Sequence, residues 1–336
     1  MARKTTARDV AEAAGVSPAT VDRVLNGRGG VSPDKEKRVL DWARRLGLDR
    51  ALMIRAARTL RVAVLIQPPA NPFHARLKEE FARAQPLLDA LNMQVRIIHI
   101  APRPPGETAE KILNAIGTHD ALILSTEENP GIAAACRAFA AKGPVVTLAT
   151  DIAGSGRMGY VGPDNRRAGR VAGDLMGRFL GPAGGEVLMI AGILAMRGQM
   201  ERAEGLRAVF AERYPACILA GVVETFEDGD RAGLLVKEAL RQRRGLRGVY
   251  HCTAGTREVA AALKAAGRGD VVLIAHELTE HRRDLLKRGV VAAVIDQNPE
   301  AEVRGAIDLL ARAFGRGEAA LRPAQPMIQI HTIENS

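Results

Sequence analysis

The sequence predicts an α/β protein in which an N-terminal all-α helix-turn-helix headpiece precedes two lobes, each a doubly wound parallel sheet. Three observations lead to this fold class. The first 47 residues carry helical periodicity with capping residues at the expected places. From residue 61 onward, short continuous apolar runs alternate with amphipathic stretches, as in parallel sheets covered on both faces. At 336 residues the chain is long enough for two or three domains.

Two short helices joined by a tight turn are predicted over residues 6–26. Thr6 is the expected N-cap of the first helix, with Asp9 in the capping-box position. Gly15 ends that helix, and Ser17-Pro18 opens the second as N-cap and first helical residue. A glycine-containing turn between two such helices is a helix-turn-helix, whose second helix enters the DNA major groove.

A loop over residues 27–30 follows, and Ser32-Pro33 starts a third helix that ends at Gly47. The headpiece is therefore expected at residues 1–47. After a connection over residues 48–60, strands are predicted at Val62–Ile66, Val95–Ile100, Ala121–Leu124, Val145–Ala149, Val187–Ile190, Ile218–Val223, Val249–Cys252, Val271–Ala275 and Val291–Ile295. Amphipathic helices are predicted at Phe73–Leu91, Gly131–Lys142, Arg166–Leu180, Arg197–Tyr214, Ala232–Arg243 and Arg257–Ala266.

A run of this length favours two lobes rather than one sheet. We place the break near Tyr160–Asn165 and a return near Asp296–Pro299. Residues 61–336 then divide into lobe 1, at about 61–162 and 297–325, and lobe 2, at about 163–296 and 326–336.

The charge of the chain is unevenly placed. The formal net charge is +10, and residues 1–61 hold 14 Lys and Arg against 7 Asp and Glu. This concentration of positive charge around the helix-turn-helix is what phosphate binding requires. Three scattered cysteines favour a reducing, cytoplasmic setting. No apolar run reaches about 18 residues and no leader-like segment opens the chain, so neither membrane insertion nor export is expected.

Two groups of short motifs stand out. In the headpiece they are Asp9-Val-Ala, Ala14-Gly-Val-Ser17, Ala19-Thr-Val and Arg23-Val-Leu-Asn26, followed by Val31-Ser32. In the core they are Tyr160–Asn165, Glu201–Gly205 and Asp296–Pro299. These motifs resemble those of the LacI/GalR family of sugar-responsive repressors. The resemblance implies a core like a type I periplasmic sugar-binding protein, with chain crossings at two of these places.

Asp22 departs from the family, which usually has a serine there. A carboxylate at this position either repels phosphate, accepts a hydrogen bond from a cytosine N4 amino group, or is a solvated surface acid.

The connection over residues 48–60 lacks the Pro-Asn opening usual in the family, where the segment folds on DNA into a hinge helix. Leu52, Met53 or Leu60 is a candidate minor-groove wedge. A plain basic linker that only touches phosphate is the alternative.

The candidate DNA contacts lie on and around the second helix. Arg23 is expected to contact a base, and Pro18 and Ala19 to set specificity by shape and methyl contact. The full set of DNA-binding candidates is Thr6, Ser17, Pro18, Ala19, Thr20, Arg23, Asn26 and Ser32.

Ligands of such folds bind between the lobes, at the carboxyl ends of strands. Asn71, Phe73 and His74 follow the first strand, and relatives have a second aromatic residue where His74 stands. Arg202 and Gln297 match the ligand-binding arginine and glutamine of the family, and a planar guanidinium suits two adjacent hydroxyls or a carboxylate. The full set of ligand-binding candidates is Asn71, Phe73, His74, Thr150, Asp151, Arg202, Phe226, Thr253, Glu277 and Gln297.

Two patterns are rejected as decoys. Gly154–Gly159 spells a dinucleotide fingerprint but leads into a strand-like segment rather than a helix. His276 and His281 are five residues apart, so they leave different faces of a helix and do not match a zinc-protease signature. We expect no cofactor, no metal and no catalytic residues, and hence no enzyme.

The function predicted is a DNA-binding transcriptional regulator, a repressor that binds a pseudo-palindromic double-stranded operator as a homodimer, with a tetramer left open. A small sugar or polyol in the inter-lobe cleft would control it. The alternative is a cytosolic sugar-binding protein without a regulatory role.

Overall fold

In the computed structural model, the described residues are 5–26, 28–48, 58–101, 104–316 and 325–336. They begin with a headpiece of three helices, α1 (Ala7–Ala14), α2 (Pro18–Leu25) and α3 (Pro33–Arg45). Thr6 and Asp9 form the reciprocal capping box of α1, and Gly15 ends that helix at φ 63°. Ser17 caps α2 by accepting a hydrogen bond from the Thr20 N–H. The helix-turn-helix expected from the sequence is therefore confirmed.

The core of the headpiece consists almost entirely of Val and Ala. Small side chains suffice because the three helices are short and pack closely. The buried cluster is Val10, Ala11, Ala14, Val21, Val24, Val39, Ala43 and Leu48.

Lobe 1 contains a five-stranded, wholly parallel sheet in the order β2-β1-β3-β4-β5. Its strands are β1 (Leu60–Ile66), β2 (Met93–His99), β3 (Ala121–Leu124), β4 (Val145–Leu148) and β5 (Gly159–Val161). Its helices are α5 (Pro72–Arg83), α6 (Gln85–Ala90), α7 (Pro105–Ala115), α8 (Pro130–Ala140) and α14 (Pro299–Ala313).

Lobe 2 contains a six-stranded sheet in the order β11-β10-β9-β8-β6-β7, in which only β11 is antiparallel. Its strands are β6 (Gly185–Ala191), β7 (Cys217–Glu224), β8 (Leu246–His251), β9 (Val272–His276), β10 (Ala293–Asp296) and β11 (Gln329–His331). Its helices are α9 (Asn165–Leu180), α10 (Arg197–Arg213), α11 (Gly229–Gln242), α12 (Thr256–Ala265), α13 (Glu280–Lys287) and the 3-10 turn η1 (Ile333–Asn335).

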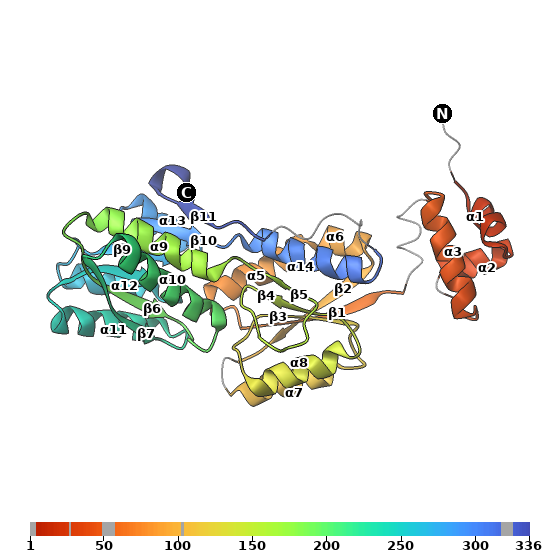
Figure 1. Cartoon of the computed structure of the whole chain (residues 1–336), viewed down its shortest axis with the longest axis horizontal. Helices are drawn as coiled ribbons and strands as arrows, with labels where there is room; N and C mark the ends of the chain where they lie inside the picture. Colours follow the sequence, from red (N-terminus) through yellow and green to blue (C-terminus); the bar gives the residue numbers. More distant parts are fainter. Residues whose placement is uncertain (1–4, 27, 49–57, 102–103, 317–324) are drawn as a thin grey trace.

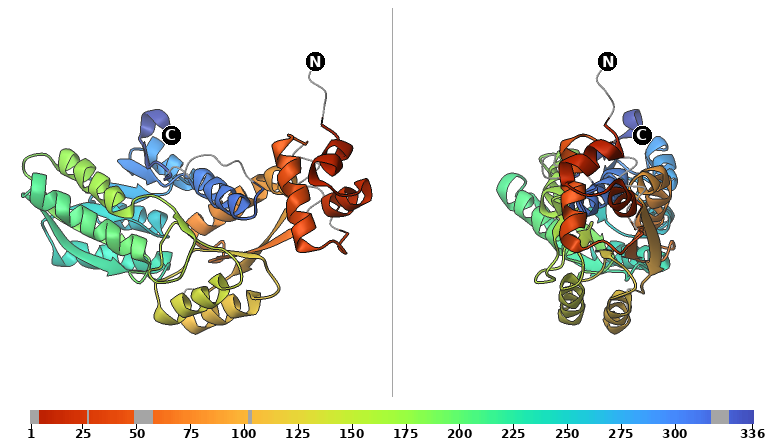
Figure 2. Two further views of the ribbon diagram at one scale, coloured as in Figure 1. Left: turned by 45° about the vertical axis from the view of Figure 1, so that its right-hand side comes forward. Right: turned by 90° about the vertical axis from the view of Figure 1, so that its right-hand side faces the viewer.

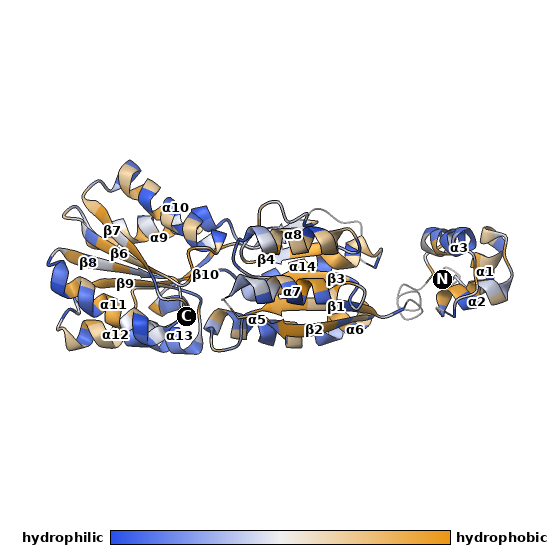
Figure 3. Ribbon diagram, turned by 90° about the horizontal axis from the view of Figure 1, so that it is seen from below, coloured by the Kyte–Doolittle hydropathy of each residue, from blue (hydrophilic) through white to orange (hydrophobic). Residues whose placement is uncertain are grey.

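Helices cover both faces of each sheet, and the two sheets lie side by side with the chain crossing between them (Figures 1 and 2). The chain leaves lobe 1 after β5 and enters α9, and it returns from β10 into α14. Strands such as β1 and β2 are mostly hydrophobic, whereas the helices carry both hydrophobic and hydrophilic residues (Figure 3). This is the arrangement that the continuous apolar runs predicted.

The structure contains elements that were not predicted, namely α7, α13, α14 and β11, and it corrects two of the predictions. The helix expected over residues 73–91 is two helices, α5 and α6, because Pro86 has no N–H to continue the ladder. Leu60 is not a minor-groove wedge: it is the first residue of β1 and only 3% exposed in the lobe 1 core. The other wedge candidates, Leu52 and Met53, lie outside the described residues.

Candidate functional site

A pocket lies between the lobes, where the carboxyl ends of strands from both sheets converge. Lobe 1 contributes the loops after β1, β3 and β4, and lobe 2 contributes loops and helix starts after β6 to β10. The lining residues are Asn71, Pro72, Phe73, His74, Ser125, Ala149, Thr150, Met196, Gly198, Gln199, Arg202, Glu227, Cys252, Thr253, Glu277, Arg282 and Gln297.

The structure brings most of the predicted ligand-binding residues together in this pocket. These residues belong to both lobes and lie at sequence positions from 71 to 297. Those that line it are Asn71, Phe73, His74, Thr150, Arg202, Thr253, Glu277 and Gln297.

Asp151 does not line the pocket. Its carboxylate binds the Arg157 guanidinium, including an Nη2–Oδ2 hydrogen bond of 2.5 Å, and accepts a hydrogen bond from the Thr147 hydroxyl at 2.8 Å. Although burial opposes it, hydrogen bonding from Arg157 and Thr147 lowers the pKa of Asp151. This carboxylate is therefore committed to shaping the loop after β4.

Phe226 also lies outside the lining. The guanidinium of Arg231 lies 5.4 Å from the centre of the Phe226 ring. The backbone turns sharply here, with φ 56° at Phe226 and 66° at Glu227. As a result the loop after β7 presents Glu227, rather than the aromatic ring, to the pocket.

Sequence reasoning missed several lining residues. Ser125 directly follows β3 and Glu227 lies three residues after β7, so inspecting the loop after every strand would have found them. Gln199 and Arg282 lie within helices α10 and α13, where no sequence signal marks them. The complete set missed is Pro72, Ser125, Ala149, Met196, Gly198, Gln199, Glu227, Cys252 and Arg282.

Buried polar atoms without a protein partner gather in the pocket. They are His74 Nδ1, Ser125 Oγ, Gln199 Oε1, Glu277 Oε2 and Gln297 Oε1. Buried polar groups in folded proteins are nearly always hydrogen-bonded. Five such atoms converging on one space fit a ligand that is rich in hydrogen-bonding groups.

Arg202 is held in place by close packing of α10 against α9. A Cβ at Gly169 would lie 2.0 Å from the Arg202 carbonyl oxygen, and one at Gly205 would lie 2.0 Å from the Arg166 carbonyl oxygen. Only glycine allows this approach of the two helices. The Arg202 Nε donates to Asn165 Oδ1 at 2.9 Å, and the side chain, 5% exposed, lines the pocket. The rest of its fork is available to a ligand.

Arg282 has a different role, although it lines the same pocket. Its Nε donates to the Thr256 hydroxyl at 2.8 Å. Its terminal nitrogens donate to the carbonyl oxygens of Glu277 at 3.1 Å and Thr253 at 2.5 Å. It therefore ties together the loops after β8 and β9.

The carboxyl groups of the pocket are easier to protonate than usual. Burial, and then the nearby Asp296 carboxylate, raise the pKa of Glu277 to about 7, against the opposing Arg202. Gln297 Nε2 donates a hydrogen bond to Glu277 Oε1, and Glu277 Oε2 has no partner. Burial also raises the pKa of Glu227, which accepts a hydrogen bond from the Thr253 hydroxyl at 2.7 Å.

His74 is a neutral hydrogen-bonding group at neutral pH. Burial, followed by the neighbouring His99, lowers its pKa to about 3. The ring is 1% exposed and meets the Phe73 ring edge-on at 5.4 Å between centroids.

Strained backbone clusters at the same strand ends. Of the six non-glycine residues with positive φ among the described residues, five follow β4, β7, β9 or β10: Ala149, Phe226, Glu227, Glu277 and Asn298. Such conformations cost of order 1–3 kcal/mol each and concentrate at binding sites. They mark these loops as shaped for ligand binding.

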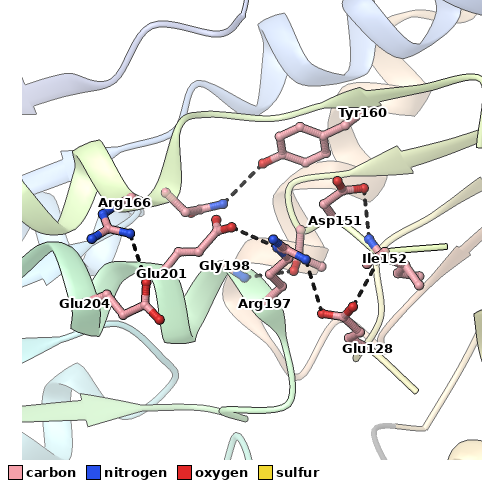
Figure 4. Close-up of polar contacts among 12 residues, drawn as sticks. Glu128, Asp151, Ile152, Tyr160, Arg166, Arg197, Gly198, Glu201 and Glu204 are labelled. Carbon is pink, nitrogen blue, oxygen red and sulfur yellow. Dashed lines mark hydrogen bonds and ion pairs between the residues drawn. The ribbon is translucent and has the colours of Figure 1, made fainter. Parts of the chain in front are cut away.

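The rim of the cleft is closed by direct contacts between the lobes. The Glu128 N–H donates to the Ala195 carbonyl at 2.8 Å, and the Gly198 N–H donates to the Thr150 hydroxyl at 3.1 Å. Arg197 lies between Glu128 and Glu201 (Figure 4). Its Nη1 is 3.8 Å from Glu128 Oε2. Thr150 therefore lines the pocket and also joins the two lobes.

The predicted DNA contacts lie on the outside of the headpiece. Thr20 is half-buried, and the other seven are exposed: Thr6, Ser17, Pro18, Ala19, Arg23, Asn26 and Ser32. The hydroxyls of Thr6 and Ser17 serve as helix caps, so their contact with phosphate would add to a structural role.

Asp22 is paired on the surface of the recognition helix. Its carboxylate accepts a hydrogen bond from Asn26 Nδ2 at 2.6 Å and forms a 3.0 Å ion pair with Arg28. Both ionic side chains remain about half exposed or more. The carboxylate therefore partly neutralises a cation beside the helix.

The two decoy motifs have ordinary structural roles. Residues 154–159 lead into β5 and open no helix. His276 ends β9, where its ring is hydrogen-bonded to the Tyr250 hydroxyl, and His281 belongs to α13. Within the described part of the chain, no group of three or more His, Cys, Asp and Glu side chains is arranged to hold a metal ion. Nor is any helix in that part long and apolar enough to cross a membrane.

The fold and site define a class: a two-lobed ligand-binding core joined to a helix-turn-helix reader. Comparison with known families agrees. Residues 62–319 match the periplasmic binding protein domain family, and residues 6–48 match the lacI family of bacterial regulatory proteins. The chain belongs to the periplasmic binding protein domain family and carries a lacI-family DNA-binding domain in front of it. It is a LacI-type transcriptional regulator.

Individual relatives match either the ligand-binding core or the N-terminal part of the chain. The ribose import binding protein RbsB of Salmonella typhimurium is 28% identical over 245 residues, covering 71% of this chain and 79% of its own. The HTH-type transcriptional regulator RegA of Clostridium saccharobutylicum is 38% identical over 76 residues, 22% of this chain and 23% of its own. An ABC transporter solute-binding protein from Burkholderia graminis, in complex with D-arabinose, superposes with a TM-score of 0.74 at 24% identity, over 83% of this chain and 97% of its own.

Proposed function

We propose that this regulator is a repressor that binds a pseudo-palindromic operator as a homodimer and is released by a small sugar or polyol bound in the inter-lobe pocket. The observation that carries the proposal is the union, in one chain, of an outward-facing recognition helix and a pocket lined by unpartnered hydrogen-bonding atoms. A dimer is favoured because one headpiece reads too few base pairs for specific binding. Because its proposed target is DNA, we expect the protein to act in the cytoplasm.

The chemistry of the pocket favours a neutral, hydroxyl-rich ligand. Ser125 and His74 can each donate or accept, and Gln199 and Gln297 offer carbonyl oxygens. Arg202 supplies a planar fork that suits two adjacent hydroxyls. Pentoses are the first candidates, because the relatives named above bind ribose or contain D-arabinose.

The two lobes adopt two arrangements, and the ligand and the operator each bind one of them more tightly than the other. Each therefore changes the affinity of the protein for the other. The ligand favours the closed cleft, and the operator favours the arrangement that aligns two headpieces. The coupling is expected to be about 1–3 kcal/mol and reciprocal. Because the pocket has no assigned catalytic group, the sugar is expected to be recovered unchanged.

The test begins with selection of duplexes from a random-sequence pool by the full-length protein at low salt. A thermal-shift screen of pentoses, hexoses and polyols, starting with D-ribose and D-arabinose, then identifies the ligand. The proposal predicts an enriched inverted repeat, a stabilising sugar, and release of the duplex by that sugar. Sugar binding without any duplex enrichment would instead support a sugar-binding protein with no regulatory role, and turnover of the sugar would support an enzyme.

A further inference from the structure

The point at which the chain from the headpiece enters lobe 1 is held by a group of polar contacts. Arg58 Nη2 pairs with Asp120 Oδ1 at 2.8 Å, and the Thr59 hydroxyl donates to Asn92 Oδ1 at 2.9 Å. Arg316, from the other end of the core sequence, completes the group. We call the connection over residues 48–60 the tether, and we call Arg58, Asn92, Asp120 and Arg316 the tether clamp.

Arg316 binds backbone at three places. Its Nη1 donates to the carbonyl oxygens of Leu91 at 2.8 Å and Asn92 at 2.7 Å. Its Nη2 donates to the carbonyl oxygen of Arg58 at 2.5 Å, across 258 positions in sequence. Burial and the nearby Arg58 cation lower the pKa of Arg316. An arginine directed at carbonyls, beside another cation, fixes backbone geometry rather than balancing charge.

Helix α14 connects this clamp to the pocket. Gln297 lines the pocket, Asn298 caps the helix, and Arg316 follows its last turn, where the Arg316 N–H donates to the Ala311 carbonyl at 2.7 Å. A helix of 15 residues spans about 22 Å. Figures 1 and 2 show α14 running along lobe 1 from the crossing between the lobes toward the end where β1 begins.

The first turn of α14 is tied to groups that a ligand would touch or move. Just before this helix, Asp296 forms an ion pair with Arg76 of lobe 1 at 2.8 Å. It also accepts a hydrogen bond from the Leu278 N–H of lobe 2 at 2.8 Å. Glu302, within that turn, is completely buried. Burial, and then the Glu277 carboxylate of the pocket, hold its pKa well above the usual range. A change in the pocket therefore acts directly on the start of this helix.

Building on the proposed function, we propose that Arg316 is a positioning residue for the DNA reader: α14 transmits the state of the pocket to Arg316, and Arg316 sets where the tether leaves the core. Its contacts to Arg58 and to the turn after α6 are the physical link. Removing them leaves the pocket and the headpiece intact but uncouples one from the other.

The first experiment uses the full chain, the duplex enriched by the wild type, and D-ribose as the probe. Operator affinity is measured with and without saturating D-ribose for the wild type, Arg316→Gln and a control, Arg304→Gln. Arg304 lies on the same helix but forms only an exposed pair with Asp308. D-ribose should change operator affinity about fivefold or more in the wild type and the control. In Arg316→Gln the change should fall below about twofold, with the D-ribose Kd itself unaltered.

The second experiment needs no sugar. Asp296→Asn weakens the contacts at the pocket end of α14, and its effect on operator affinity is measured alone and combined with Arg316→Gln. Transmission along α14 predicts that the two effects are not additive, by more than about twofold in Kd. Far-ultraviolet circular dichroism and melting curves show that each variant remains folded.

The outcomes separate the two proposals. If the wild type enriches no duplex, the proposed function fails and this inference fails with it. If the wild type enriches a duplex but the Asp296 and Arg316 effects add, or if Arg316→Gln keeps the full D-ribose response, only the role of Arg316 is overturned.

Discussion

The headpiece and the inter-lobe pocket are held together in opposite ways. In the headpiece the side-chain contacts around the recognition helix are local: Ser17 bonds Thr20, three positions away, and Asp22 bonds Arg28, six positions away. In the pocket the side-chain contacts reach across the chain, as between Arg202 and Asn165, 37 positions apart, or between Thr253 and Glu227, 26 positions apart. The first region exposes its functional side chains, whereas the second buries them.

This difference separates two kinds of functional surface. A reader of DNA needs rigid, outward-facing side chains, and a short motif with good caps supplies them. A ligand pocket needs unpaired polar atoms out of water, and only a large fold can hold these against their cost. Each region should therefore respond to mutation in its own assay, and the following changes test that separation.

The largest effect is expected from Arg202→Ala. Truncation removes the charged fork from the pocket and leaves Asn165 Oδ1 without its donor. Sugar affinity, measured by isothermal titration calorimetry, should fall by roughly 2–5 kcal/mol. Operator affinity without sugar should be unchanged. Arg207, exposed on the same helix, gives the matched control Arg207→Ala, which should leave sugar affinity unaltered. A normal sugar affinity in Arg202→Ala would remove this residue from the site.

Arg23→Ala should produce the reverse pattern. Loss of a base contact is expected to cost about 1–3 kcal/mol at the selected operator, measured by fluorescence anisotropy, with sugar affinity intact. Arg241→Ala, an exposed charge removal on α11, controls for the change in net charge. If Arg23→Ala and its control bind the operator equally, Arg23 makes no groove contact.

A pH titration of sugar binding is expected to give an effect of intermediate size. The pKa of Glu277 is about 7 in the free protein. A ligand hydroxyl that donates to the carboxylate favours the ionised form and so lowers this raised pKa. Affinity should therefore be full above pH 7 and be lost as pH falls through 7, by about tenfold between pH 8 and pH 6. Glu277→Gln should abolish the dependence, whereas Glu280→Gln, exposed on α13, should retain it. A flat profile in the wild type would show that Glu277 does not bind ligand through its charge.

The smallest effect is expected from Asp22→Ser. The Asp22–Arg28 pair is exposed and contributes at most about 1 kcal/mol to folding. Breaking it frees Arg28 to meet phosphate, so operator affinity should rise slightly and the dependence of log K on log salt should steepen by about one unit. Weaker binding with an unchanged salt slope would instead indicate that the carboxylate contacts a base.

The same difference explains what could be predicted from the sequence. The caps at Thr6 and Ser17, the turn at Gly15 and the exposure of Arg23 depend on neighbours within a few positions, so the motif was sufficient. The alternation of strands and helices predicted two sheets and most strand ends. Gln199 and Arg282 escaped because they reach the pocket from inside helices, and Phe226 was misplaced because the positive φ at Phe226 and Glu227 reverses which side chain faces inward.

Energetic coupling between the headpiece and the pocket can be measured in a single titration. The complex of full-length protein and selected operator is titrated with the sugar found in the screen, and sugar affinity is measured with and without operator. Coupling predicts that sugar weakens operator binding by about 5- to 150-fold and that operator weakens sugar binding by the same factor. If both ligands bind but neither affinity depends on the other, the pocket does not control the headpiece and the proposed regulation by sugar is wrong.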